Sequence, residues 1–134
     1  MAIVIDASVF CAYANAKDIH HHNSKKIFSD ILSKKYGEAI LTDYLFDEIV
    51  SVIFRKTNKK TATEIGNVIL NSEVFLVQID AVVFEKAWKI FPKENSFSFT
   101  DCTTIAFNDT FGITHVATFD KEFSKLKNIT VINE

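Results

Sequence analysis

The feature that most constrains the fold is a short segment near the N-terminus, IVIDAS at residues 3–8. Its three successive β-branched residues predict a strand that is apolar on both faces, as in a central parallel strand covered by helices on each side. Asp6 follows this strand at once, and a helical run begins at Val9. Because open α/β sheets bind their ligands at the carboxyl ends of the strands, Asp6 marks the expected position of a functional site.

Strand and helix patterns alternate along the rest of the chain. The strands expected are 3–5, 39–41, 74–79, 115–117 and 129–132, and the helices expected are 9–14, 25–36, 43–57, 61–70, 80–91, 98–112 and 121–126. We expect Gly37 to end the second helix and Thr42 to cap the third. The alternation predicts an α/β fold, a small three-layer α/β/α sandwich with a mainly parallel central sheet of four to five strands. Without a linker or repeat, residues 1–134 are expected to form one domain.

Composition excludes several classes of protein. No apolar run approaches the roughly 18 residues of a membrane span, and a signal peptide is not evident, so we expect a cytoplasmic protein. Cys11 and Cys102 are expected to be reduced thiols, because two cysteines make no secreted disulfide framework. The formal net charge is −2. Two basic clusters, around residues 25–35 and 55–60, are nevertheless candidates for binding phosphates, although a solvated helix face explains either of them.

Three aspartates, Asp6, Asp101 and Asp120, each precede or open a helix. Helix capping alone explains each of them, because Asp is a favoured residue at helix starts. A fourth acid, Glu48, lies inside an expected helix, where capping does not apply. Periodicity places it at one edge of the apolar stripe and Asp47 at the other, and does not decide between them.

A functional interpretation requires these acids to converge. Carboxylates packed together repel one another and raise each other's pKa, so their convergence requires a compensating cation. Mg²⁺ and Mn²⁺ are hard ions that bind carboxylate and phosphate oxygens. The sequence contains no P-loop, dinucleotide fingerprint, HExxH motif or cysteine-rich zinc spacing that would indicate another chemistry.

Four segments together resemble the PIN-domain family, and within it the VapC-type toxins of toxin–antitoxin pairs. They occur in the family's order over nearly the whole chain: IVIDAS at 3–8, LTDYLFDEI at 41–49, SFTDCTTIAF at 98–107 and ATFDKEF at 117–123. The resemblance implies a doubly wound α/β sandwich. It also implies an endoribonuclease that hydrolyses RNA with Mg²⁺ (or Mn²⁺), leaving a 5′-phosphate and a 3′-hydroxyl.

The resemblance assigns the site residue by residue. The family's catalytic and metal-binding acids match Asp6, Glu48, Asp101 and Asp120, and its helix acid matches Glu48 rather than Asp47. All four acids are present, which argues for an active nuclease.

The resemblance also assigns two hydroxyl residues and leaves one position open. Ser8 and Thr118 match positions that orient the carboxylates or water. Some members carry a further acid shortly after the third one, but Thr103 and Thr104 stand in that region here. That ligand is therefore left unfilled.

The resemblance implies partners as well: an RNA substrate, a small antitoxin protein that covers the acidic groove, and a second copy in a homodimer. A nuclease of RNA maturation without a toxin role is the alternative. Two further alternatives are a phosphatase, which would require an acid where Ser8 stands, and a receiver-like signalling module with Asp80 as phosphoacceptor. Both leave most of the acids unexplained. Residues 20–22 are three adjacent histidines, which cannot all bind one ion from a helix.

Overall fold

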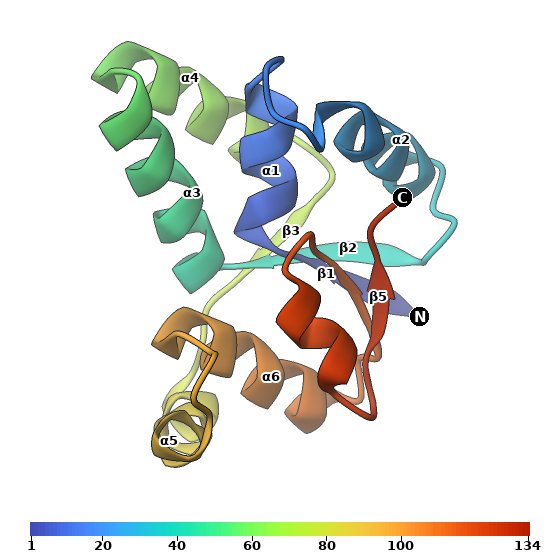
Figure 1. Cartoon of the computed structure of the whole chain (residues 1–134), viewed down its shortest axis with the longest axis vertical. Helices are drawn as coiled ribbons and strands as arrows, with labels where there is room; N and C mark the ends of the chain where they lie inside the picture. Colours follow the sequence, from blue (N-terminus) through green and yellow to red (C-terminus); the bar gives the residue numbers. More distant parts are fainter.

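The protein, described over all residues 1–134 in a computed structural model, is built on one five-stranded sheet (Figure 1). Its strands are β1 (Ala2–Ile5), β2 (Glu38–Thr42), β3 (Phe75–Val77), β4 (His115–Ala117) and β5 (Thr130–Ile132). The spatial order is β3-β2-β1-β4-β5, and every neighbouring pair is parallel. The predicted α/β class and parallel sheet are confirmed.

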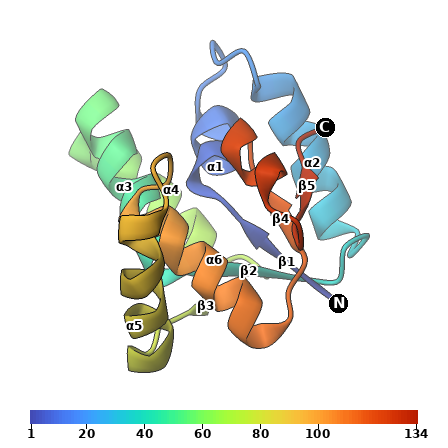
Figure 2. The ribbon, with the colours of Figure 1, turned by 60° about the horizontal axis from the view of Figure 1, so that its bottom comes forward.

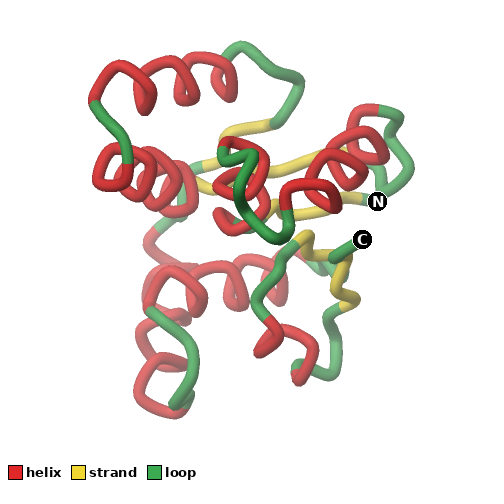
Figure 3. The backbone as a smooth tube through the Cα atoms, turned by 45° about the horizontal axis from the view of Figure 1, so that its top comes forward, coloured by secondary structure: helices red, strands yellow, loops and turns green.

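Helices cover both faces of the sheet, as Figures 1 and 3 show. The first four lie on one face: α1 (Ala7–Ala14), α2 (His21–Leu32), α3 (Asp43–Lys56) and α4 (Lys59–Leu70). The other face carries α5 (Ala81–Ile90), α6 (Phe99–Phe111) and two short 3₁₀ turns, η1 (Phe91–Lys93) and η2 (Lys121–Lys125). The three-layer sandwich is therefore confirmed. No helix is long and apolar enough to cross a membrane.

Strand β1 occupies the centre of the sheet because its side chains are apolar on both faces. Ile3, Val4 and Ile5 are completely buried, and β1 pairs with β2 on one side and β4 on the other. From β1 the chain first adds β2 on one side of this strand and later returns to add β4 on its other side. This reversal between adjacent strands is the place where open α/β sheets form a crevice at their carboxyl ends.

The second helix differs from its prediction at both ends. It spans His21–Leu32 rather than 25–36, and Lys34 rather than Gly37 is the first residue after it with a positive φ, of 64°. Gly37 instead lies in the turn before β2, with φ of 82°. A Cβ at this position would lie 2.0 Å from the carbonyl oxygen of Met1. Gly37 therefore permits the start of β2 to approach the start of β1, and the prediction that it ends a helix is wrong.

Candidate active site

The four predicted acids come from four separate elements around the reversal between β1 and β4. Asp6 directly follows β1, and Asp120 directly precedes η2 just beyond β4. Glu48 lies in the second turn of α3, and Asp101 lies in the first turn of α6.

Asp6 is buried and is held by two hydroxyl groups. Ser8 Oγ donates to Asp6 Oδ2 at 2.7 Å, and Thr118 Oγ1 donates to the same oxygen at 2.9 Å. No donor of the chain bonds Oδ1. Although Asp6 occupies the N-cap position of α1, its side chain makes no capping hydrogen bond. Capping therefore does not explain this carboxylate.

The same hydroxyls connect Asp6 to the turn that carries Asp120. The Asp120 backbone N–H donates to Thr118 Oγ1 at 3.0 Å, and the Phe119 N–H donates to Ser8 Oγ at 3.1 Å. The hydroxyl groups thus donate to one acid and accept from the backbone beside the other. This network fixes the end of β4 against the end of β1.

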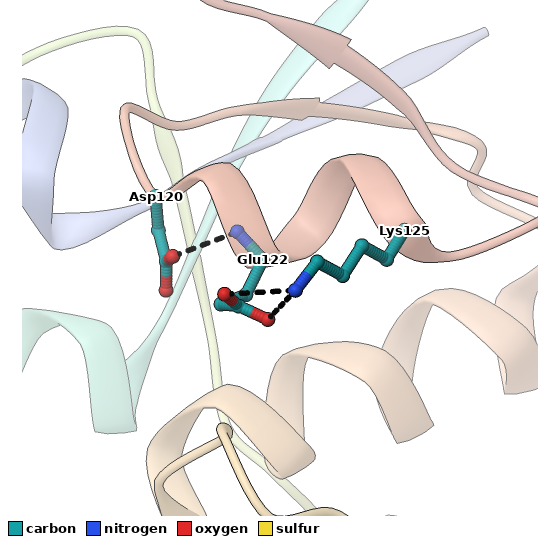
Figure 4. A network of polar contacts seen from close by, with 3 residues as sticks. All are labelled: Asp120, Glu122 and Lys125. Carbon is teal, nitrogen blue, oxygen red and sulfur yellow. Dashed lines mark hydrogen bonds and ion pairs between the residues drawn. The ribbon is translucent and has the colours of Figure 1, made fainter.

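Asp120 also caps η2 with one of its carboxylate oxygens (Figure 4). The Glu122 N–H donates to Asp120 Oδ1 at 3.0 Å, and Oδ2 has no donor. The Glu122 carboxylate is bonded by Lys125 Nζ at 2.9 and 3.1 Å, and this hydrogen bond lowers the pKa of Glu122. Since Lys125 is occupied by Glu122, it does not neutralise Asp120.

Asp101 combines capping with a position near the other acids. It forms a capping box: the Ser98 N–H donates to Asp101 Oδ2 at 2.9 Å, and the Asp101 N–H donates to Ser98 Oγ at 3.1 Å. Burial raises the pKa of the Asp101 carboxyl, and the charges of Asp6 and Asp120 raise it further, against the lowering effect of the Ser98 hydrogen bonds. The charges of Asp6 and Asp120 therefore act on Asp101, and its Oδ1 has no donor.

Glu48 faces the same region from α3. Burial raises its pKa to about 7, and the next largest causes are the charges of Asp6 and Asp101. Its carboxylate accepts no hydrogen bond, whereas the exposed Asp47 accepts one from Ser51 Oγ at 3.2 Å. Glu48 is therefore partly buried and affected by the charges of Asp6 and Asp101, whereas Asp47 is exposed. Helical periodicity alone did not distinguish these two residues.

The donor set fits a hard divalent cation. The chain forms five ion pairs, and none of them includes any of these four acids. Each aspartate uses one oxygen for its hydrogen bonds and leaves the other free, which is the donor chemistry that Mg²⁺ and Mn²⁺ prefer. No three acidic, histidine or cysteine side chains are arranged to hold an ion as they stand. Shared coordination therefore requires the carboxylates to approach one another.

The raised pKa of Glu48 predicts a pH-dependent stability. Its folded-state pKa of about 7 exceeds its ordinary value of 4.5, so folding takes up a proton between these pH values. The free energy of unfolding should therefore fall as the pH rises through this window, by on the order of 1 kcal/mol, since solvent screens a half-exposed group. Glu48→Gln should flatten this dependence in urea unfolding measured with a chelator.

The control for this measurement is Asp47→Asn, which removes a neighbouring exposed acid from the same helix turn. It should keep most of the wild-type slope between pH 5 and pH 8, because the Asp47 charge raises the pKa of Glu48 less than burial and the charges of Asp6 and Asp101 do. An undiminished slope in Glu48→Gln would show that another group titrates and that the pKa of Glu48 is not raised.

Other candidate residues have structural explanations. Asp80 Oδ1 accepts the Val83 N–H at 2.9 Å, so it caps α5, and it lies beyond the edge strand β3 rather than at the reversal. Cys102 is completely buried, and burial raises the pKa of the half-buried Cys11 thiol to about 11. Both cysteines are free, as predicted.

The two basic clusters differ in their availability. Lys34 and Lys35 lie beyond the end of α2, and each pairs with a carboxylate, at 2.9 and 3.4 Å. The prediction of a helix over residues 25–36, which would place Lys25, Lys26, Lys34 and Lys35 on one helix, is therefore wrong at its C-terminal end. The second cluster, residues 55–60 between α3 and α4, takes part in no ion pair. Arg55 and Lys56 lie on α3, the helix that carries Glu48, and Lys59 and Lys60 lie at the start of α4.

The chain is similar in sequence to known ribonucleases. The chain is 30% identical over 105 residues to a VapC ribonuclease of Archaeoglobus fulgidus, covering 75% of this chain and 66% of that protein, slightly under two thirds of its length. It is 25% identical over 124 residues to the 23S rRNA-specific endonuclease VapC20 of Mycobacterium tuberculosis, covering 91% of this chain and 92% of that protein.

Solved structures show the same fold. The crystal structure of Mycobacterium tuberculosis VapC20, a Sarcin-Ricin loop cleaving toxin, matches with a TM-score of 0.83 and 22% identity over 95% of this chain and 96% of that one. DNA-bound VapBC from Salmonella typhimurium matches with a TM-score of 0.71 and 11% identity over 98% and 96%. The family model for the PIN domain matches residues 3–129. The chain therefore belongs to the PIN domain family.

Proposed function

We propose that this protein, as a single PIN-like domain over residues 1–134, is a metal-dependent endoribonuclease of the VapC type. One observation supports the proposal: carboxylates from four elements lie close enough for their charges to raise the pKa of Glu48 and of Asp101, and no cationic side chain forms an ion pair with any of the four. Neighbouring like charges and burial both disfavour the ionised form of a carboxyl group, so a cluster of acids without basic partners indicates a binding site for a cation. The names of the curated relatives, a VapC ribonuclease and a 23S rRNA-specific endonuclease, support the same activity.

In this proposal Asp6, Glu48, Asp101 and Asp120 hold one or two Mg²⁺ (or Mn²⁺) ions. A divalent ion bound there would supply an activated water and would neutralise the charge that develops on the phosphate. Neighbouring residues of the chain orient the carboxylates. Two hydroxyl donors fix Asp6, a backbone N–H fixes Asp101 and another fixes Asp120, so the free oxygen of each aspartate has a defined direction.

The RNA backbone would bind at the basic cluster of residues 55–60. The cluster spans the end of α3 and the start of α4, and Glu48 also lies on α3. Phosphates bound to the cluster would therefore be near the acids. Contacts to phosphates position a nucleic acid without selecting its sequence. The base sequence must therefore be selected by other residues of the site.

The test is cleavage of RNA by the purified protein. Ribosomal RNA and short single-stranded RNAs should be cut when Mg²⁺ or Mn²⁺ is added and left intact with excess chelator. The products should carry 5′-phosphates, detected by ligation. A substrate with a single 2′-deoxy sugar at the cleaved position should still be cut, because the proposed nucleophile is water rather than the 2′-hydroxyl. Cleavage that persists in chelator, or none with either metal, would contradict the proposal.

We further propose that the protein is the toxin of a type II pair, inhibited by a small antitoxin. Several structural relatives were solved as VapBC complexes, which supports such a partner. An apolar groove between α1, α2 and α4, lined by Tyr13, Phe28 and Val68 among others, offers a surface for an apolar helix of that partner. A short antitoxin-like gene beside the coding sequence would favour this role over RNA maturation.

A homodimer is the second assembly that we propose. Exposed aromatic side chains on and after α5 support it: Phe84, Trp88 and Phe91 are all at least one third exposed, and the Trp88 and Phe91 rings stack with centroids 5.9 Å apart. Apolar patches of this kind commonly mark contacts with another protein chain.

A further inference from the structure

Two aromatic rings from opposite ends of the chain stack beside the acids. The His20 and Phe119 ring centroids are 4.3 Å apart, and the ring planes differ by 8°. His20 lies directly before α2, and Phe119 lies between β4 and η2. Both side chains are half-buried, so part of the pair is open to solvent.

The pair is fixed to the same network that fixes Asp6. The Phe119 N–H donates to Ser8 Oγ, and Ser8 donates to Asp6. Phe119 also directly precedes Asp120, at about 3.8 Å between Cα atoms. Figure 2 shows the turn before η2, in red, beside α1, the helix that carries Ser8. The stacked rings are therefore adjacent to the acids.

The backbone of His20 is fixed, but its ring nitrogens are free. The His20 N–H donates to Asp18 Oδ1 at 2.8 Å, and the His20 carbonyl accepts the Ser24 N–H at 2.9 Å. Neither ring nitrogen of His20 bonds any protein group, whereas His21 Nδ1 contacts the carbonyl oxygen of Ala12 at 2.9 Å. Hydrogen bonding thus accounts for the orientation of the His21 ring but not for that of the His20 ring.

We infer that the His20–Phe119 pair is a base-stacking subsite, which holds one unpaired base of the RNA next to the scissile phosphate. Bases of single-stranded RNA are recognised by stacking on aromatic side chains, including histidine. A base on this pair would extend a stack that the protein has already formed, and its ribose-phosphate would lie toward Asp120. The inference rests on the proposed nuclease function and adds to it the residues that seat a base.

The first test compares His20→Ala with two matched variants. His20→Phe keeps a ring for stacking, and His22→Ala removes an exposed histidine of the same helix that lies outside the pair. We expect His20→Ala to raise KM for a short single-stranded RNA about tenfold, since loss of base stacking on an aromatic ring has effects of this order. The kcat should change by less than about threefold. His20→Phe should restore the wild-type KM, and His22→Ala should leave it unchanged.

The second test locates the base. Oligonucleotides that lack one base at a time should bind the wild type more weakly at one position next to the cleaved bond, and His20→Ala should show no further loss at that position. Fluorescence anisotropy in chelator measures this binding without cleavage, so it tests the subsite even if the protein cuts no RNA. An unchanged KM in His20→Ala, or an equal loss at every abasic position, would overturn the inference while leaving the proposed function intact.

Discussion

Replacement of Asp6 by Asn should reduce RNA cleavage by at least about 1,000-fold, equivalent to about 4 kcal/mol of transition-state stabilisation. Asp6 is the most buried of the four acids and the only one whose carboxylate is fixed by two hydroxyls. Asn keeps an oxygen for these hydroxyls but brings no charge to a cation. The substitution therefore removes metal affinity while preserving the local hydrogen bonds.

The same variant should fold at least as stably as the wild type. In chelator its free energy of unfolding should be unchanged or up to about 1 kcal/mol higher, because one of several repelling charges is removed. Added Mg²⁺ should raise the Tm of the wild type, since a ligand that binds only the folded state stabilises it. Asp6→Asn should lose this rise, whereas Asp47→Asn should keep both the rise and the cleavage. Full cleavage by purified Asp6→Asn would remove the mechanism.

The fold was largely predictable because its main signals are local. Three β-branched residues in a row at 3–5 indicated a central strand, and the structure buries all of them completely. The bounds of α2 were mispredicted because the positive φ after the helix falls on Lys34, a residue that carries no sequence signal for it. Gly37 does carry the sequence signal for a positive φ, but it lies where the backbone of Met1 approaches too closely for a side chain. Glycine indicates a special backbone conformation without indicating which one.

The site was predictable only in part, because convergence is not a local property. The sequence pattern placed acids after β1 and β4, but the choice of Glu48 over Asp47 came from the family resemblance, and the structure supplies its physical reason in burial and in the facing charges. The His20–Phe119 pair had no signal at all. Its two residues are far apart in the chain, and the argument that three adjacent histidines cannot all bind one ion treated residues 20–22 as equivalent. Only tertiary packing distinguishes His20 from its neighbours.

Asp101 allows capping to be tested separately from the proposed catalytic role, because only one of its two carboxylate oxygens takes part in the cap. Oδ2 accepts the Ser98 N–H, and Oδ1 remains free. Asp101→Asn should keep the cap and the stability but lose cleavage by at least about 1,000-fold. Ser98→Ala should do the reverse: it removes the hydroxyl that accepts the Asp101 N–H, costs about 1 kcal/mol of stability and leaves the acid charged.

Asp101→Asn should lose cleavage and keep its stability, and Ser98→Ala should lose stability and keep cleavage. This opposite pattern is expected only if the carboxylate of Asp101 has a role beyond the helix. Urea unfolding in chelator gives the stability of each variant, and single-turnover cleavage at saturating Mg²⁺ gives its activity. If Asp101 were only a cap, Asp101→Asn would keep its activity, because Asn preserves the cap, and only Ser98→Ala could lower activity through the position of α6. An Asp101→Asn variant at least as active as Ser98→Ala would therefore contradict the assignment of Asp101 to the metal site, even if Asp6→Asn behaves as expected.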